Sequence, residues 1–257
     1  MRKYLVLTMA LGALVALSVA GIAMAAQDTV IRAGNLVVTV DGSSGVSPKA
    51  LSKSTYTPVK FTAAGSVRTT DGSQPPPIKE VLLEAKNAAV DVKGYPTCSS
   101  SALQARDTKA VEKACPDSII GKGTTTVSVA FPEQTPIPAK SPLLVFNGGT
   151  SGGTTTFYIH AYLTQPITTA IVTTVKIKKA GTGLKTVTSV PKIANGAGSV
   201  TDFSLTIDKK FNYKGKQHSV LSAKCIGGKI QAHVTAVFYD SSPKLSSDVL
   251  RTCTSKP

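Results

Sequence analysis

Tryptophan is absent from this chain of 257 residues, and all aromatic residues together make up 5% of it. Because flat aromatic rings usually help to hold sugars, this scarcity argues against a dedicated carbohydrate-binding module without excluding one. Only three histidines are present, His160, His218 and His233, at unrelated spacings. Metal ligands must be brought together by the fold, so we interpret them as packed or surface residues and expect no metal or cofactor.

Acidic residues are also few, with 14 Asp and Glu against 29 Lys and Arg, and the formal net charge is +15. Glycoside hydrolysis needs two carboxylates about 5–10 Å apart across a cleft, and no recognisable pair occurs. Asp202 and Asp208 flank one alternating segment and are expected to face solvent. The basic charge favours anionic partners, although lysines spread along a chain also serve solubility alone.

Only one apolar run is long, from Leu5 to Ala20, and it follows the basic pair Arg2-Lys3. The small residues Ala23-Met24-Ala25 then form an A-x-A cleavage site, which completes the pattern of a secretory signal peptide. The alternative is an uncleaved membrane anchor, which takes about 20 apolar residues. The small residues before the cleavage site favour removal of residues 1–25. We expect residues 26–257 to form a single secreted β-sandwich domain without a membrane span.

The cysteines show no C-x-x-C spacing, so neither a zinc ribbon nor a thioredoxin-like motif is supported. An even number of cysteines in an exported chain predicts two disulfides, and three pairings are open. Pairing between sequence neighbours closes the smallest loops and is the pairing we expect. The four residues are Cys98, Cys115, Cys225 and Cys253.

Residues with branched β-carbons dominate the rest of the chain, and runs of Gly, Pro, Ser and Asn interrupt them. This combination is typical of strands joined by turns. About ten strands with short turns predict an all-β fold, namely an antiparallel β-sandwich or jelly roll. The expected strands lie within residues 30–40, 59–67, 78–92, 124–131, 143–146, 154–163, 171–178, 200–207, 219–225 and 230–239.

One segment, between Cys98 and Cys115, is expected to be helical. Ser101 and Gln104 fit a capping box, and Pro116 prevents extension of the helix. A straight helix over these positions would separate the two cysteines by about 25 Å. A disulfide instead needs Cα atoms about 4.4–6.8 Å apart, so the segment must turn back if these cysteines pair.

The turn is expected near residues 106–108, where Asp107 could cap a second short helix that ends at Ala114. The result would be a short disulfide-stapled helical excursion, at about residues 98–116, inserted in a β-domain.

Pro96 to Cys98 and Cys115 to Gly121 together form a P-x-C … C-P-x-S-x-I-G pattern. This pattern resembles a segment of secreted, β-rich proteins of actinobacteria, which are largely uncharacterised. Leu144 to Gly148 and the two late cysteines also fit that type of protein. The resemblance implies export, β-structure and the local disulfide. It implies no activity, so no catalytic residue is carried over.

Gly149-Thr150-Ser151-Gly152-Gly153 fits the G-x-S-x-G pattern of a nucleophile elbow and resembles the G-D-S-G-G of trypsin-like proteases. Trypsin-like proteases need a His and an Asp before the Ser, but every histidine here follows Ser151. A hydrolase elbow must open a helix, whereas residues 154–159 are typical of a strand. We therefore interpret the segment as a hairpin loop and assign no catalytic residue.

The densest basic patch lies in residues 209–216, where aromatic residues alternate with lysines and could stack on bases or sugars. The same residues would also suit an ordinary solvated hairpin. The candidate anion-binding residues are Lys209, Lys210, Lys214 and Lys216, and the candidate stacking residues are Phe211 and Tyr213.

These features together predict an exported, non-catalytic protein that is secreted or associated with the cell surface. It would bind an anionic polymer or polysaccharide of the cell envelope, or contribute structure there, and nucleic acid is not the expected partner. The alternative is a secreted hydrolase with an unfamiliar active site. The sequence leaves the specific ligand and the oligomeric state open.

Overall fold

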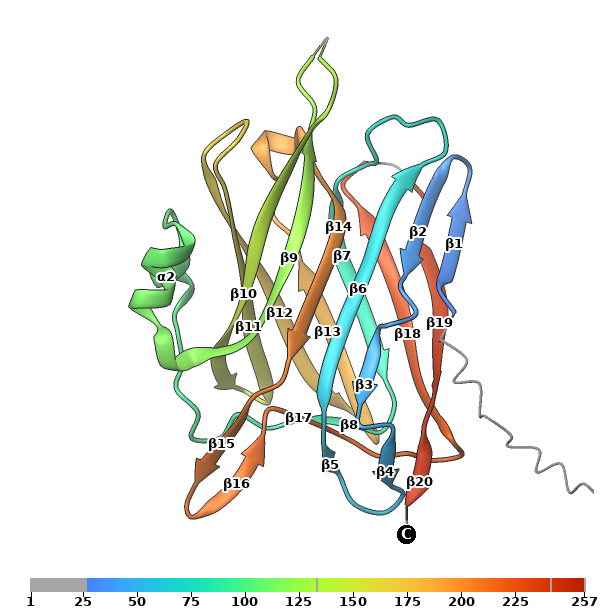
Figure 1. The fold of residues 1–257 in the computed structure, drawn as a ribbon, viewed down its shortest axis with the longest axis vertical. Helices are drawn as coiled ribbons and strands as arrows, with labels where there is room; N and C mark the ends of the chain where they lie inside the picture. Colours follow the sequence, from blue (N-terminus) through green and yellow to red (C-terminus); the bar gives the residue numbers. More distant parts are fainter. Residues whose placement is uncertain (1–26, 133, 241, 257) are drawn as a thin grey trace, which may run out of the picture.

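The computed structural model describes residues 27–132, 134–240 and 242–256 (Figure 1). The expected signal peptide, residues 1–25, lies outside the described residues. The long strands are β1 (Thr29–Ala33), β2 (Leu36–Val40), β6 (Lys60–Thr69), β7 (Ile78–Ala85), β9 (Ile119–Val129), β10 (Ile137–Ser151), β11 (Thr154–Leu163), β12 (Thr169–Ala180), β13 (Gly183–Ser189), β14 (Gly198–Ile207), β18 (Lys229–Phe238) and β19 (Leu245–Thr252). The short strands are β3 (Gly45–Ser47), β4 (Ala50–Ser52), β5 (Thr57–Pro58), β8 (Ala88–Val90), β15 (Lys210–Tyr213), β16 (Lys216–Ser219), β17 (Leu221–Ala223) and β20 (Thr254–Lys256).

The long strands form one antiparallel sheet in the order β1-β2-β6-β14-β9-β10-β11-β12-β13-β7-β18-β19, and β3 pairs with β6 beside this path. The sheet folds over at β10 and β11, so β9, β14, β6 and β2 face β12, β13, β7 and β18 (Figure 1). Its two end strands, β1 and β19, come close together, and the sheet is nearly closed.

The prediction of an antiparallel all-β fold is confirmed, but its finer form differs. A sandwich or jelly roll has two separate sheets, whereas here hydrogen bonding continues from the front layer to the back layer through β10 and β11. The reason is that β9 to β13 follow one another as antiparallel hairpins, so each strand bonds to the next around the bend.

Two glycines allow β9 and β14 to approach closely. Gly121 pairs with Ile207, and Gly123 pairs with Leu205. A Cβ on Gly123 would collide with the carbonyl oxygen of Ser204, and one on Gly121 would lie 2.5 Å from the neighbouring carbonyl oxygen of β14. Bulky residues on one strand therefore fill the space that glycine leaves on the other.

The core lies between the front and back layers. Towards the nearly open side, residues of β2 and β6 pack against residues of β7, β18 and β19. In a second cluster, β10 and β11 contribute large side chains that meet the other strands. The buried members include Leu36, Val67, Ile78, Phe238 and Leu245 at the open side and Val145, Phe157, Ile177, Leu184 and Ile207 in the second cluster.

Arg251 on β19 closes the open side. Its side chain is 6% exposed and donates hydrogen bonds to the carbonyl oxygens of Ser44 at 2.8 Å, Asp41 at 3.0 Å and Leu250 at 3.0 Å. Asp41 and Ser44 belong to the connection between β2 and β3. Because a buried charge needs polar groups in place of its water, these carbonyls hold the last long strand against the front layer.

The helical excursion between Cys98 and Cys115 consists of α1 (Ser100–Leu103) and α2 (Thr108–Ala114), joined to β9 by the 3-10 turn η1 (Pro116–Ser118). Asp107 caps α2 as the sequence predicts, since its side chain accepts from the backbone N–H of Ala110. The expected capping box in α1 is wrong, because Ser99 is the N-cap there and Gln104 ends the helix.

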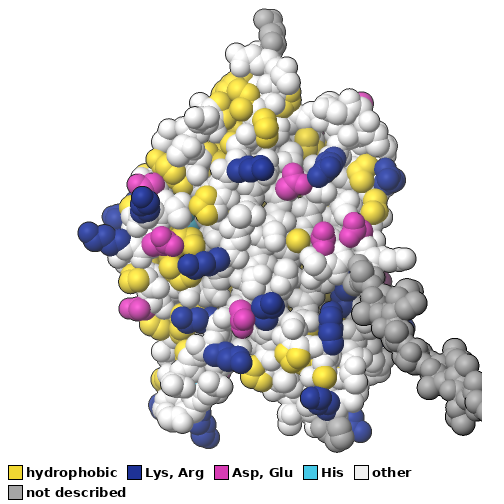
Figure 2. Space-filling view, viewed as in Figure 1, with side chains coloured by type: hydrophobic (Ala, Val, Ile, Leu, Met, Phe, Trp, Pro, Cys, Tyr) yellow, Lys and Arg dark blue, Asp and Glu magenta, His cyan; other side chains and the backbone are white. Residues whose placement is uncertain are grey.

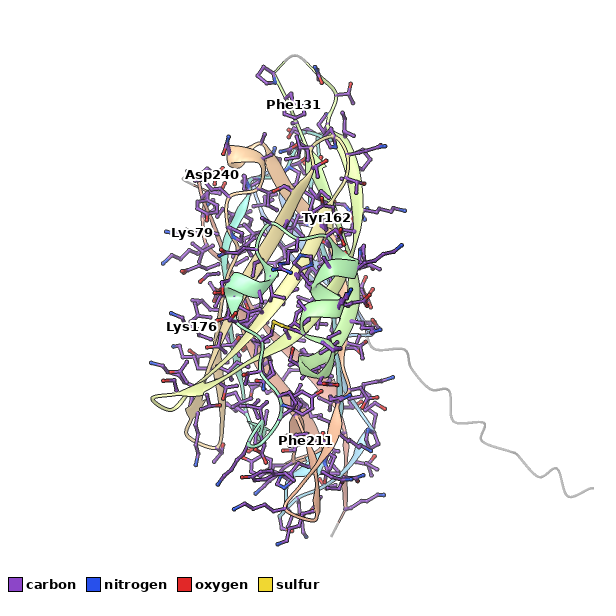
Figure 3. All side chains as sticks on the ribbon, turned by 90° about the vertical axis from the view of Figure 1, so that its left-hand side faces the viewer. Lys79, Phe131, Tyr162, Lys176, Phe211 and Asp240 are labelled. Carbon is purple, nitrogen blue, oxygen red and sulfur yellow. A yellow bond between two sulfur atoms is a disulfide. The ribbon has the colours of Figure 1, made fainter. Side chains whose placement is uncertain are left out.

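The excursion packs on the outer face of the sheet at β10 and β11 (Figure 3). Leu103 and Val111 from the helices are fully buried against Leu144 and Phe146 of β10. A disulfide joins Cys98 to Cys115 across its base. In the described part of the chain, no helix is long and apolar enough to cross a membrane.

Candidate functional site

The basic segment forms the hairpin of β15 and β16 at one end of the molecule (Figure 1). The turn consists of Lys214 and Gly215, which have φ angles of +50° and +74°. Such angles suit a tight two-residue hairpin turn. All four candidate anion-binding lysines, Lys209, Lys210, Lys214 and Lys216, are exposed.

The two candidate stacking residues contact the protein itself. The ring of Phe211 lies 5.0 Å from that of Tyr95 and stacks on His218 at 5.4 Å. Tyr213 meets His218 edge-on at 5.9 Å and also covers Gly94, whose missing Cβ leaves room for the ring. Both aromatic side chains are half-buried. They hold the hairpin in place, and only part of each ring faces solvent.

Polar contacts fix the same cluster. Nδ1 of His218 lies 2.8 Å from a carboxylate oxygen of Asp91. The hydroxyl of Tyr95 donates to the carbonyl oxygen of Ile119 at 3.0 Å, and burial raises the pKa of Tyr95, which keeps this donor protonated. The ammonium of Lys209 lies 5.9 Å from the Tyr95 ring centre. We call residues 91–96 and 208–219 the hairpin lobe.

A second basic region lies beside the hairpin lobe at the same end of the molecule. It consists of residues 49–58, 86–90, 221–229 and 252–256, which we call the staple lobe because the disulfide Cys225–Cys253 crosses it. Strand β4 pairs with β20, and β17 pairs with both β5 and β8. These segments contain six lysines and no Asp or Glu: Lys49, Lys53, Lys86, Lys224, Lys229 and Lys256.

The two lobes together form the basic end of the molecule. The hairpin lobe adds Lys93 and its four candidate lysines, against only Asp91 and Asp208. In Figure 2 the lower part of the front face shows several basic side chains and few acidic ones. None of the basic-end lysines forms an ion pair with an acidic residue within the described residues.

The opposite end carries balanced charge. Its described turns, residues 70–77, 134–136, 164–168, 191–197, 239–240 and 242–244, contain two lysines and two aspartates. Figure 3 places Asp240 and Phe131 towards this end and Phe211 at the basic end. The four charged residues of these turns are Lys192, Lys244, Asp71 and Asp240.

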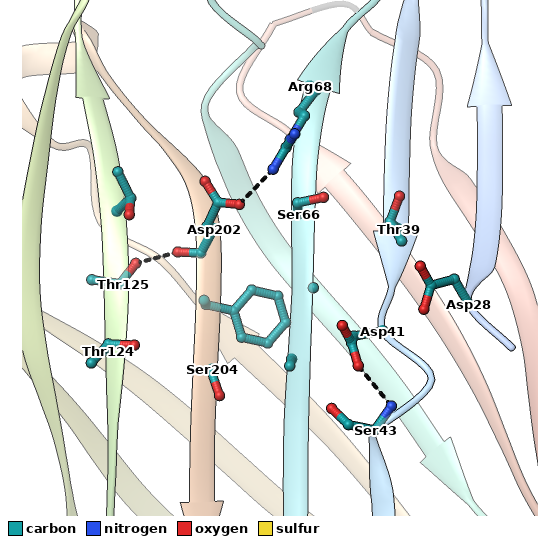
Figure 4. A pocket seen from close by; sticks show the side chains of 14 residues that line it. Asp28, Thr39, Asp41, Ser43, Ser66, Arg68, Thr124, Thr125, Asp202 and Ser204 are labelled. Atoms are coloured by element: carbon teal, nitrogen blue, oxygen red, sulfur yellow. Dashed lines mark hydrogen bonds and ion pairs between the residues drawn. The ribbon is translucent and has the colours of Figure 1, made fainter. Parts of the chain in front are cut away.

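A shallow hollow of about 640 Å³ lies on the front face of the sheet, over β2, β6, β14 and β9 (Figure 4). Arg68 and Asp202 form an ion pair at 3.0 Å along it. The carboxylate of Asp41 accepts from the backbone N–H of Ser43, and the side chain and backbone of Ser43 together lower the pKa of Asp41. The rest of the lining includes the carboxylate of Asp28, the ring of Phe203 and several hydroxyl groups, among them those of Thr39, Ser66, Thr124, Thr126 and Ser204. The charged pair is already satisfied, and the hollow has the character of an ordinary solvent-facing sheet surface.

The other candidate residues lie far apart in the fold. Ser151 is exposed beside the Gly152-Gly153 turn that joins β10 to β11. His160 is buried beneath the helical excursion, where its Nε2 donates to the carbonyl oxygen of Arg106 at 2.9 Å. His233 pairs with an aspartate on β19 at 2.9 Å. Among the residues that the structure describes, no three His, Cys, Asp or Glu side chains are grouped closely enough to hold a metal ion.

Sequence reasoning found the hairpin lobe but missed the staple lobe. The lysines of the staple lobe are spread from Lys49 to Lys256, so no local density marks them. The available signal was the absence of Asp and Glu throughout residues 42–70 and 221–239. No protein-family model, curated protein or solved structure matches this chain.

Proposed function

We propose that this chain is an exported, non-catalytic protein that binds an anionic polymer or polysaccharide of the cell envelope at its basic end, with the hairpin lobe as the polymer site. The observation that carries the proposal is the gathering of lysines from distant parts of the chain at one end, while the opposite end is balanced. Two disulfides are also consistent with an oxidising compartment outside the cytoplasm.

The hairpin lobe is suited to this role because its lysines are exposed on a rigid support. Phe211 and Tyr213 anchor the hairpin through the aromatic cluster, which leaves the four lysines free to meet a ligand. A preorganised set of charges loses less conformational freedom on binding than charges on a flexible tail. Several anionic groups of one polymer could then be held at once, which strengthens binding without deep burial.

A secreted hydrolase is the alternative function, and one contact favours it. His218 and Asp91 pair at 2.8 Å, as in sites where a carboxylate orients a histidine that acts as a general base. Purified protein should be incubated with panels of esters, glycosides and peptides. Turnover that is lost in His218→Asn would replace the binding proposal with the catalytic one.

The binding proposal is tested by measuring affinity for a purified anionic wall polymer at low salt. Replacing Lys209, Lys210, Lys214 and Lys216 with Gln should weaken binding more than tenfold while leaving the fold intact, because exposed lysines contribute little to stability. The control has the same change in net charge but alters lysines away from the basic end, with Gln at Lys79, Lys140, Lys192 and Lys244. Equal losses in the two variants, or no binding by the parent protein, would refute the proposal.

A further inference from the structure

The staple lobe exposes apolar side chains among its lysines. Ile226 is 50% exposed at the turn that leads into β18, and Tyr56 is 40% exposed on the connection after β4. Within the described residues these are two of the five large hydrophobic residues with such exposure, and the others are Val30, Ile137 and Leu250. The staple lobe therefore combines exposed apolar surface with unbalanced positive charge.

The position of Ile226 is fixed by its surroundings. Gly227 and Gly228, with φ angles of +63° and +71°, turn the chain back so that Ile226 pairs with Lys229. Cys225, immediately before Ile226, is fully buried and bonded to Cys253. The apolar side chain is consequently held outward on a stiff tip with a lysine directly beside it.

Tyr56 belongs to the same surface. Its hydroxyl donates to the carbonyl oxygen of Thr182 at 2.8 Å, and the ammonium of Lys224 lies 4.4 Å from the centre of its ring. Tyrosine combines an apolar ring with a polar tip, which suits the boundary between lipid headgroups and hydrocarbon. A lysine beside it would place its charge at headgroup level.

We propose that the staple lobe docks on the surface of an anionic lipid bilayer, with Ile226 entering the interface and the surrounding lysines contacting the headgroups. Charge complementarity selects an anionic partner, because six lysines stand there without an acidic residue. The exposed Ile226 selects a bilayer over a polar polymer, since only the bilayer offers apolar surface in which the side chain can be buried.

This docking surface is distinct from the polymer site assigned to the hairpin lobe, so the two can be tested separately. The chain has no tryptophan. Ile226→Trp therefore gives a single fluorescent reporter at the proposed point of insertion, and Ile137→Trp gives a control at an exposed site at the start of β10, at the opposite end of the molecule.

The vesicles should contain phosphatidylcholine and phosphatidylglycerol in roughly a 2:1 ratio, with pure phosphatidylcholine as the neutral comparison. Ile226→Trp should shift its emission to shorter wavelength with the anionic vesicles alone, and Ile137→Trp should not shift. Equal shifts at both positions, no shift at Ile226→Trp, or the same shift with a soluble anionic polysaccharide would overturn the proposal.

Vesicle sedimentation supplies the second readout. Ile226→Ser should weaken binding about fivefold because it removes apolar surface from the interface. Gln at Lys49, Lys53, Lys229 and Lys256 should weaken it by about fivefold for each lysine that contacts the bilayer. The four-lysine variant of the hairpin lobe should retain vesicle binding while losing polymer binding. Equal loss of vesicle binding from both lobes would mean that net charge alone is responsible, against the proposal.

Discussion

The two ends of the molecule are built from the same kind of turns but carry different charge. At the basic end the staple lobe has six lysines and no acid, whereas the turns at the opposite end have lysines and aspartates in equal number. An antiparallel sheet sends every second connection to the same end, so residues distant in sequence become neighbours there. Charge that is spread along the sequence is thus concentrated in space by topology.

The ends also differ in how they are held. The opposite end is closed mainly by short connections between long strands, whereas the basic end is a layer of short strands tied by a disulfide and, nearby, by buried Arg251. Short strands bury little apolar surface, so covalent and polar ties carry more of the stability. Breaking the disulfide or the Arg251 hydrogen bonds should therefore destabilise the basic end more than the opposite end.

The largest effect is expected from replacing Cys225 and Cys253 with Ser. The closed loop spans 28 residues, and its loss should lower the free energy of unfolding by about 3–4 kcal/mol. Hydrogen exchange should accelerate most in the staple lobe, with little change in the turns of the opposite end. Uniform acceleration at both ends would show that the ends are not held independently.

A smaller loss is expected for Arg251→Leu. The substitution leaves the buried carbonyl oxygen of Ser44 without its Arg251 donor and removes one of the two donors to the carbonyl oxygen of Asp41, which should cost about 2–3 kcal/mol. Denaturant unfolding measures the loss. The matched control is Arg68→Leu, whose exposed ion pair with Asp202 should contribute less than about 1 kcal/mol. A similar loss in both variants would contradict the closing role of Arg251.

The helical excursion lies at neither end of the molecule, and the stability contributed by His160, which lies beneath it on β11, should depend on pH. Burial lowers the pKa of His160 below its ordinary value of 6.5, although the bond to Arg106 and the charge of Asp107 act in the opposite direction. On acidification the unfolded chain takes up this proton first. The His160 contribution to stability is therefore complete above pH 6.5 and declines as the pH falls.

The expected slope is at most about 1.4 kcal/mol per pH unit, and it ends once the pH passes the folded-state pKa. His160→Leu should remove this component of the stability profile, since protonation would otherwise create a buried Nδ1–H that has no partner among the described residues. His233→Gln, at an exposed position, should leave the component in place. A profile that is unchanged in His160→Leu would contradict this assignment.

The smallest effect concerns the basic-end lysines themselves. Gln at Lys209, Lys210, Lys214 and Lys216 should change the free energy of unfolding by less than about 1 kcal/mol, because these side chains are exposed. Thermal unfolding with and without the substitutions checks this expectation. A large loss would mean that the lysines serve the fold, and binding data from the variant would then say nothing about a site.

Much of the fold follows from local pattern, and the exceptions have physical causes. Residues 154–163, which are rich in β-branched and aromatic residues, predict β11 at its observed bounds. The segment at residues 30–40 was expected to hold one strand, but Gly34 turns the chain and divides it into β1 and β2. Strands β13 and β19 were not predicted, because their outward residues include Lys185 and Asp248 and their apolar content is low.

One part of the candidate site could be predicted from the sequence, and the other part could not. The hairpin lobe was predictable because its four candidate lysines lie within eight consecutive positions, 209–216. The partners that bury Phe211 and Tyr213, among them Tyr95 and Gly94, come from a distant segment that only the fold brings into contact. The staple lobe depends wholly on such contacts, since its pairing of β4 with β20 joins residues from the two ends of the described chain.

The central claim is that the location of the lysines, and not the net charge, directs binding. It is tested most directly by a charge-swap variant of unchanged net charge, measured against a purified anionic wall polymer at low salt. Gln replaces Lys209, Lys210, Lys214 and Lys216, and Lys replaces the exposed opposite-end residues Thr70, Gln134, Thr135 and Thr164. Affinity should fall more than tenfold, because the hairpin lobe no longer presents its four lysines to the polymer. Affinity equal to that of the parent protein would contradict the account.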